Sequence, residues 1–159
     1  MSNLDLVLKG GTVFLPDGRT TTDIGIKDGK ISIIGTCDNA EKVVDCTNLF
    51  IFPGLIDTPC HFREPGGEHK ETIQTGTMSA ALGGIVGIFE MPNTNPLTTT
   101  PEALEHKIKR GTETAYTDFA YYFGGTYENS KNLPQWENLD GVCGIKIFMG
   151  ASTGNLLSA

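Results

Sequence analysis

Two side chains with clear chemical potential, His61 and Arg63, follow an apolar run at residues 49–56 and precede a Pro/Gly-rich loop. The run predicts a buried strand, and enzymes built on parallel sheets carry reactive groups at the carboxyl ends of their strands. A neutral imidazole at such a strand end is a good zinc ligand, although a loop histidine can also serve only as a hydrogen-bonding group. The neighbouring Asp57 and Arg63 favour the ligand over this plainer role.

Arg63 is a candidate for binding an anionic substrate. It lies two residues beyond His61, so on an extended backbone the two side chains point to the same side. Its planar guanidinium matches a carboxylate through two parallel hydrogen bonds. A surface salt bridge with Glu64 or Glu68 is the alternative role for this arginine.

Asn93 follows a second apolar run, residues 85–91, in a loop that Pro92 and Pro96 stiffen. If the two runs form parallel strands, Asn93 reaches the same edge of the sheet as Arg63, where its amide can donate and accept hydrogen bonds. An ordinary turn initiated by the asparagine is the alternative. Together with Arg63, the position favours a substrate-binding role.

Lys146 interrupts a third apolar run, residues 142–149. A buried lysine is costly unless it is paired or chemically altered. Reaction with CO₂ would convert it to a carbamate that bridges two metal ions, whereas at an exposed strand edge it would simply reach solvent. The loop that follows, residues 150–155, is rich in Gly and hydroxyl groups and is a candidate anion-binding nest, but it lacks the ending of a P-loop.

The remaining thiol and imidazole groups near these motifs have plainer interpretations. Cys60 is adjacent to His61 and should face the opposite side of an extended strand, which favours a packed thiol over a ligand. We expect His69 in a loop and His106 on the surface of a helix.

The elements that must position these residues fall into two parts. Up to about residue 52, alternating apolar residues predict short strands at residues 4–8, 12–15, 23–27, 30–34 and 43–45. Asp28-Gly29 suits the type I′ turn of a hairpin, and Gly10-Gly11 should separate the first two strands. Residues 1–52 are therefore expected to form an N-terminal β-sandwich-like module.

After Pro53-Gly54 the pattern changes to strands that alternate with helices. Strands are predicted at residues 85–91, 118–123 and 142–149, and helices at residues 70–82, 101–113 and 133–139. Thr100 and Pro101 form a typical helix start. This alternation indicates a parallel sheet. Because a complete (β/α)₈ barrel takes roughly 250 residues, residues 53–159 are expected to supply only its first half.

Composition narrows the class of protein. The chain has 159 residues, a formal net charge of −7 and four cysteines. The negative charge argues against nucleic-acid or acidic-membrane partners. No run is long enough to span a bilayer, and the N-terminus lacks the features of a signal peptide. Cysteines without a C-x-x-C pair fit reduced thiols, so a cytoplasmic location is expected.

With these motifs assembled, the chain resembles the dihydroorotases of the amidohydrolase superfamily, class I type, and in particular the N-terminal part of their sequence. The resemblance rests on Pro53-Gly54-Leu55-Ile56-Asp57, His61-Phe62-Arg63-Glu64-Pro65-Gly66, Lys70-Glu71, Thr75-Gly76, Gly83-Gly84, Met91-Pro92-Asn93-Thr94 and Lys146-Ile147-Phe148-Met149-Gly150. It implies a metal-dependent hydrolase barrel beside an N-terminal β module. The reaction implied is the reversible cyclisation of N-carbamoyl-L-aspartate to L-dihydroorotate in pyrimidine biosynthesis.

The resemblance also implies roles for individual residues. His61 would bind one of one or two zinc ions, and Lys146 would be the carboxylated bridge. Arg63 and Asn93 would hold the substrate carboxylate. Allantoinases look similar but typically carry Asn at the position of Arg63, and hydantoinases lack the Arg-Glu-Pro-Gly continuation.

Two departures from the family pattern shape the expected function. The family usually has His-x-His where this chain has Pro59-Cys60-His61, and loss of one imidazole should weaken a first metal site. The family's later ligands and its proton-shuttling Asp lie on strands that this sequence does not contain. We therefore expect this chain to be inactive alone. The alternatives are a non-catalytic scaffold for aspartate carbamoyltransferase, a related allantoinase or hydantoinase, and association as a homodimer.

Overall fold

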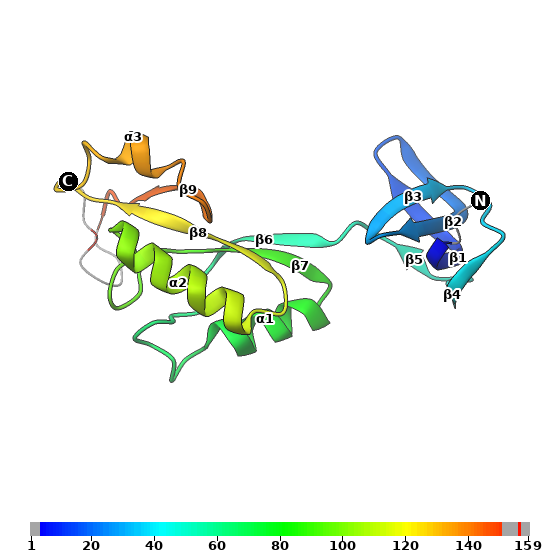
Figure 1. The fold of residues 1–159 in the computed structure, drawn as a ribbon, viewed down its shortest axis with the longest axis horizontal. Coiled ribbons are helices and arrows are strands. Elements are labelled where there is room, and N and C mark those ends of the chain that lie inside the picture. The colour runs from blue at the N-terminus through cyan, green and yellow to red at the C-terminus, as the bar shows by residue number, and fades with distance from the viewer. Residues whose placement is uncertain (1–3, 151–155, 157–159) are drawn as a thin grey trace. The chain divides into compact units, whose positions relative to one another are not determined.

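The computed structural model describes residues 4–150 and 156, and the chain divides into two compact units, Met1–Pro53 and Gly54–Ala159 (Figure 1). In the described part of the chain, no helix combines the length and apolar character that a membrane crossing requires.

The first unit is a five-stranded sheet in the order β3-β2-β1-β4, with β5 also paired to β1. Its strands are β1 (Leu4–Leu15), β2 (Gly18–Lys27), β3 (Lys30–Ile34), β4 (Ala40–Asp45) and β5 (Phe50–Ile51). β1 and β2 are antiparallel, whereas β4 and β5 run parallel to successive halves of β1. The long first strand therefore organises the whole unit.

Local chemistry explains the turns of this unit. Asp28 and Gly29 both have positive φ, 50° and 71°, and join β2 to β3 as the predicted hairpin. We predicted that Gly10-Gly11 separates two strands, and this was wrong. β1 continues through both glycines, with a shift in its pairing register to β2 between Leu8 and Gly11. The Asp23 carboxylate accepts hydrogen bonds from the backbone N–H groups of Gly10, at 2.8 Å, and Cys37, at 3.1 Å.

The apolar run at residues 49–56 is not one buried strand, so that prediction was wrong. Residues 50–51 form β5 in the first unit, residues 52–54 link the units, and a new strand begins at Leu55. Leu55 and Ile56 are 61% and 59% exposed. Apolar character alone does not show where a chain passes from one unit to the next.

The second unit is a parallel sheet in the consecutive order β6-β7-β8-β9, with two long helices packed on it. Its elements are β6 (Leu55–Cys60), α1 (Ile73–Leu82), β7 (Ile85–Glu90), α2 (Pro101–Thr114), β8 (Asp118–Gly125), α3 (Leu133–Trp136) and β9 (Val142–Ile147). Strand, helix and next parallel strand recur in chain order, which is how a (β/α)₈ barrel begins. The predicted fold class is confirmed.

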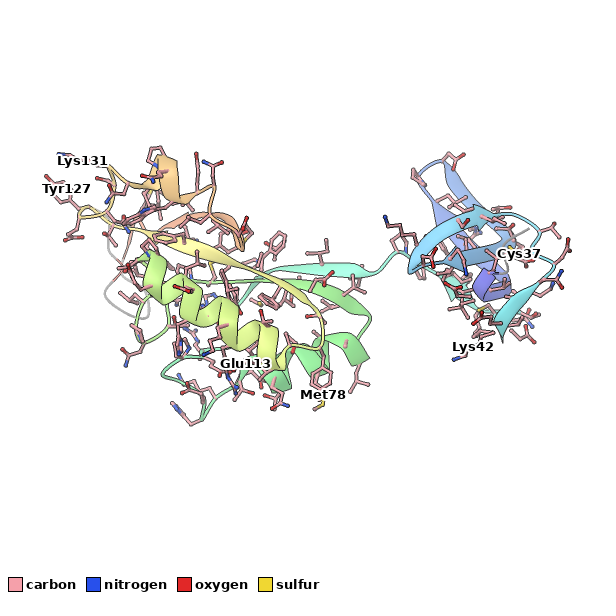
Figure 2. All side chains as sticks on the ribbon, viewed as in Figure 1. Cys37, Lys42, Met78, Glu113, Tyr127 and Lys131 are labelled. Carbon is pink, nitrogen blue, oxygen red and sulfur yellow. The ribbon has the colours of Figure 1, made fainter. Side chains whose placement is uncertain are left out.

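The core of this unit lies between the sheet and the helices. Its fully buried members are Ile73, Leu104, Tyr121 and Phe123. Met78 on α1 and Glu113 on α2 project from the outer surface (Figure 2). α2 begins as predicted, with Thr100 capping the backbone N–H of Ala103.

α1 starts three residues later than predicted, because its N-terminus needs a cap that only Thr72 supplies. The Thr72 hydroxyl accepts a hydrogen bond from the backbone N–H of Thr75. The Thr75 hydroxyl in turn accepts one from the backbone N–H of Thr72, which completes a capping box. Gly76 lies where α1 passes close to Phe62, since a Cβ on it would lie 2.5 Å from the Phe62 ring. The helix is thereby held against the segment that carries His61 and Arg63.

Candidate active site

The ends of three parallel strands supply the predicted site residues. β6 leads directly into His61, β7 leads into the loop that carries Asn93, and Lys146 lies near the end of β9. Because β6 to β9 are parallel, these carboxyl ends share one side of the sheet. Arg63 and Asn93 line one pocket of about 200 Å³.

Arg63 has φ of +73°, in the left-handed region that non-glycine residues rarely occupy. Our expectation of an extended path from His61 to Arg63 was therefore wrong. Its Nη1 atom is buried and has no hydrogen-bond partner among the residues described, and the same is true of Oδ1 of Asn93. These two polar groups of one pocket are thus available to hydrogen-bond water or a ligand.

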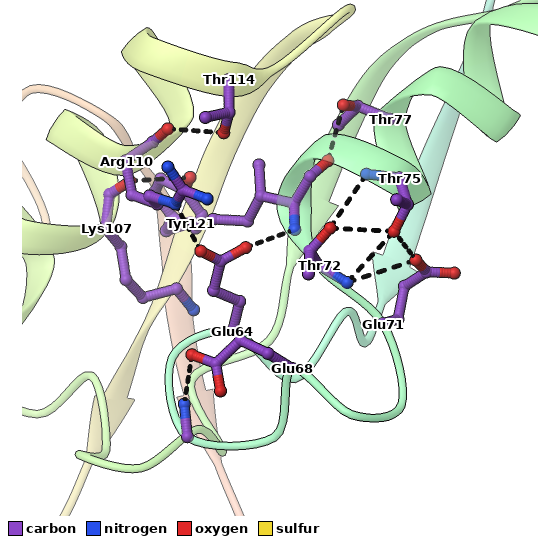
Figure 3. Close-up of polar contacts among 12 residues, drawn as sticks. Glu64, Glu68, Glu71, Thr72, Thr75, Thr77, Lys107, Arg110, Thr114 and Tyr121 are labelled. Atoms are coloured by element: carbon purple, nitrogen blue, oxygen red, sulfur yellow. Dashed lines mark hydrogen bonds and ion pairs between the residues drawn. The ribbon is translucent and has the colours of Figure 1, made fainter.

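Arg63 forms no salt bridge with Glu64 or Glu68, which was its alternative role. Glu64 is bound instead by Arg110, whose Nε lies 2.5 Å from Oε1, and its other oxygen accepts the backbone N–H of Ile73 at 2.7 Å (Figure 3). Glu68 accepts the backbone N–H of Gly66 at 2.9 Å. Both carboxylates are thus engaged by other groups, and the Arg63 guanidinium stays available to the pocket.

The pocket contains two further side chains, an imidazole and an ammonium group, that we did not predict as site residues. His69 and Lys70 line it together with Arg63, and His69 lies in a loop, as expected. The available signal was the charged run Glu68-His69-Lys70 directly after a Gly-Gly turn. These side chains give the pocket a positive character that suits an anionic ligand.

The two loops that form the pocket are joined by their backbones. The N–H of Asn95 donates to the carbonyl oxygen of Pro65 at 2.8 Å. Gly66, with φ of +91°, lies so close that a Cβ on it would be 2.3 Å from the Asn95 carbonyl oxygen. Only glycine permits both this conformation and this approach. The loops after β6 and β7 therefore form a single surface.

His61 is exposed, and its surroundings favour the neutral imidazole. Partial burial and then the Arg63 charge lower the pKa of His61, while the Asn93 side chain acts in the opposite direction. Cys60 is buried, its Sγ donates to the Phe89 carbonyl oxygen at 3.5 Å, and burial together with Glu90 raises the pKa of this thiol to about 12. The prediction that Cys60 is a packed thiol is confirmed.

Lys146 is half-buried, and its Nζ lies 4.9 Å from the ring centroid of Phe148. Within residues 4–150 and 156, no three His, Cys, Asp or Glu side chains come together as a metal site requires. His61 is the one imidazole at the strand ends, and Pro59 offers no donor. These side chains by themselves therefore do not fit a zinc ion.

Two other predicted features can be placed. His106 is exposed on α2, as expected for a helix-surface residue. Residues 151–155, most of the predicted anion-binding loop, lie outside the described residues.

Comparison with known proteins places this arrangement in a family. A family model described as dihydro-orotase-like matches residues 48–142. The chain is 43% identical over 123 residues to a dihydroorotase from Bacillus cereus (strain B4264), covering 75% of this chain and 28% of that protein. It is 36% identical over 151 residues to an allantoinase from Desulfitobacterium hafniense (strain Y51), covering 93% of this chain and 33% of that protein.

A solved structure extends the likeness to three dimensions. The L-hydantoinase (dihydropyrimidinase) from Arthrobacter aurescens superimposes with a TM-score of 0.90 at 32% identity, over 98% of this chain and 35% of that one. The chain thus spans about a third of the length of each relative. Its first barrel strands, its paired loops after β6 and β7, and the family match together show that the chain belongs to the dihydro-orotase-like family.

Proposed function

We propose that this chain carries the substrate-carboxylate site of a dihydroorotase-like cyclic amidohydrolase, which interconverts N-carbamoyl-L-aspartate and L-dihydroorotate. One observation carries the proposal: Arg63 Nη1 and Asn93 Oδ1 are both buried, have no hydrogen-bond partner among the described residues, and line the same pocket as Lys70. An amide side chain and a guanidinium fork together match a carboxylate and an adjacent N–H group.

The chemistry of the two substrates explains why such a site is useful. Ring closure consumes one carboxylate of N-carbamoyl-L-aspartate, as the carbamoyl nitrogen forms an amide and water leaves, while the other carboxylate is retained. A group that binds the retained carboxylate can hold both substrate and product. Arg63 and Asn93 would therefore orient the reacting atoms in both directions of the reaction, which is a positioning contribution.

We further propose His61 and Lys146 as this chain's contribution to the zinc site of the complete enzyme. Zinc would supply polarisation of the ring carbonyl, but the described residues do not fit the ion alone. We accordingly expect the 159-residue chain to show no turnover of N-carbamoyl-L-aspartate. Zinc-dependent turnover by the purified chain would contradict this expectation.

The binding proposal can be tested on the purified chain by isothermal titration calorimetry with three ligands. N-carbamoyl-L-aspartate and L-dihydroorotate carry the carboxylate, and allantoin, the substrate of the allantoinase alternative, carries none. We expect binding of the first two and none of allantoin. Arg63→Lys keeps the charge but loses the fork, so affinity should fall about tenfold or more. Arg19→Lys, in the other unit, is the matched control. Equal binding of allantoin would refute the proposal.

A non-catalytic scaffold is the second candidate, and Pro59 at the position of a family ligand favours it. Its partner would be aspartate carbamoyltransferase, or a second copy of this chain in a homodimer. Sedimentation of the purified chain alone and mixed with aspartate carbamoyltransferase separates the possibilities. A stable mixed complex without binding of N-carbamoyl-L-aspartate would favour the scaffold over the enzyme.

A further inference from the structure

A buried ion pair lies directly behind the candidate site. Nζ of Lys107, on α2, is 2.7 Å from Oε2 of Glu90, the last residue of β7, and each side chain is only 1% exposed. The same Nζ donates to the carbonyl oxygen of Met91 at 3.2 Å and lies 4.8 Å from the ring centroid of Tyr121. The Tyr121 hydroxyl in turn donates to the Lys107 carbonyl oxygen at 3.0 Å. The ammonium group is thus enclosed by β7, its following loop and β8.

The Glu90 carboxylate faces the segment that carries His61 and Arg63. Glu90 pairs with Cys60 across β6 and β7, and the N–H of the next residue, Met91, donates to the Cys60 carbonyl oxygen at 3.0 Å. Burial raises the pKa of Glu90, and Lys107 and the backbone N–H groups of Phe62 and Arg63 oppose that rise. Neither Glu90 oxygen has a hydrogen bond of regular geometry in the described part of the chain, so these N–H dipoles act on the carboxylate mainly through space.

An ion pair of this kind is a poor source of stability. Removing two charges from water costs about as much as their attraction returns, and an apolar pair of similar volume often serves equally well. Tyr121, which the Lys107 ammonium group contacts, belongs to an apolar core cluster with Ile73 and Leu104. Stability alone therefore does not explain why two charged side chains are buried here.

The pair touches both loops of the pocket. Glu90 pairs with Cys60, directly before the segment that carries His61 and Arg63, and Lys107 donates to the Met91 carbonyl oxygen at the start of the loop that leads to Asn93. A single ammonium group is therefore linked to the two segments that carry the unpartnered pocket atoms. The left-handed φ of Arg63, +73°, is a conformation that persists only where surrounding contacts impose it.

We propose that Glu90 and Lys107 are positioning residues, which hold the loops after β6 and β7 in the register that points Arg63 and Asn93 into one pocket. Their role is exerted through the pairing of Glu90 with Cys60 and through the bond of Lys107 to the Met91 carbonyl oxygen. The effect on ligand affinity rests on the proposed function, whereas the effect on the loop backbone does not.

The test compares Glu90→Gln, Lys107→Met and the double variant Glu90→Met/Lys107→Met. A purely structural pair predicts that the double variant, which leaves no buried charge, regains both stability and affinity for N-carbamoyl-L-aspartate. A positioning pair predicts that stability returns in the double variant while affinity stays reduced by about tenfold or more, because the loops lose their common anchor. Thr77→Val is the matched control, since it removes a buried 2.6 Å bond to Ile73 in the same unit without touching the pocket.

Amide hydrogen exchange supplies a second readout that needs no ligand. In the double variant the N–H of Asn95, which joins the two loops by donating to the Pro65 carbonyl oxygen at 2.8 Å, should exchange at least about tenfold faster, while the Ile73 N–H, bound by Glu64 at 2.7 Å, should keep its rate. Unchanged exchange and unchanged affinity in the double variant would overturn the proposal. If the unmodified chain binds no N-carbamoyl-L-aspartate, the proposed function fails, and the exchange rates still decide the positioning role. If Glu90→Gln does not fold, the double variant and Lys107→Arg are compared for stability and affinity instead.

Discussion

Replacement of Glu64 should show that a single carboxylate anchors the site loop to the helix behind it. Its side chain is 7% exposed; one oxygen accepts the N–H of Ile73 at the start of α1, and the other binds Arg110, which is 38% exposed. In Glu64→Gln the amide oxygen can keep the bond to Ile73, and Arg110 can turn to solvent. The loss is then one half-exposed ion pair, about 1 kcal/mol.

Glu64→Ala removes the acceptor as well as the charge. The Ile73 residue is fully buried, so its N–H is left without a partner, at a cost of about 2 kcal/mol. Added to the ion pair, the total destabilisation becomes about 3 kcal/mol. The large difference between the two variants is therefore the expected signature of an acceptor that stabilises the helix start, rather than of a charge.

Urea unfolding followed by tryptophan fluorescence measures these values. The chain has a single tryptophan, Trp136, in the second unit, where its ring lies 5.3 Å from that of Phe123. Glu68→Gln, an exposed glutamate in the same loop, is the control and should change the free energy of unfolding by less than about 0.5 kcal/mol. Equal losses for Glu64→Gln and Glu64→Ala would show that the charge, not the acceptor, dominates, and would refute this reasoning.

Three further outcomes follow from particular contacts. Backbone N–H groups of Cys37 and Gly10 lower the pKa of Asp23 in the folded chain. The stability that the Asp23 carboxylate contributes is therefore present above its pKa in the unfolded chain and is lost as the pH falls through its lower pKa in the folded chain. Asp23→Asn should flatten that part of the acid-unfolding curve. Cys60, with a pKa of about 12, should resist iodoacetamide at pH 8 in the folded chain and react fully in urea, as mass spectrometry can show. Gly66→Ala should abolish N-carbamoyl-L-aspartate binding in calorimetry, because its Cβ would lie 2.3 Å from the Asn95 carbonyl oxygen; retained affinity would mean that the two loops separate without cost.

Elements with strong local signals could be predicted from the sequence. Asp28-Gly29 gives a hairpin because both residues accept positive φ, and Thr100-Pro101 starts α2 because the threonine caps an N–H that the helix cannot use. The run at residues 49–56 misled us, since apolar residues are equally compatible with one strand or with two strands in different units. Its division depends on long-range pairing that no local pattern contains.

The convergence of Arg63 and Asn93 was predictable from the sequence, whereas its geometry was not. Arg63 and Asn93 could be named because polar groups after apolar strands meet at one edge of a parallel sheet. The left-handed turn at Arg63 could not, because it is imposed by neighbours distant in sequence. Lys107 resembles any surface lysine of an amphipathic helix, and only its pairing with Glu90 across the fold shows that it is buried.

The contacts divide the proposed chemistry into a part that this chain builds and a part that it does not. The pocket lined by Arg63 and Asn93 is supported by the Asn95–Pro65 bond and by Glu64, and in our proposal also by the Glu90–Lys107 pair. The metal chemistry has no such support, since the described residues bring no three donors together. Under the proposed function, carboxylate binding and metal chemistry should therefore be separable, because Arg63 and Asn93 would serve the first and His61 and Lys146 the second.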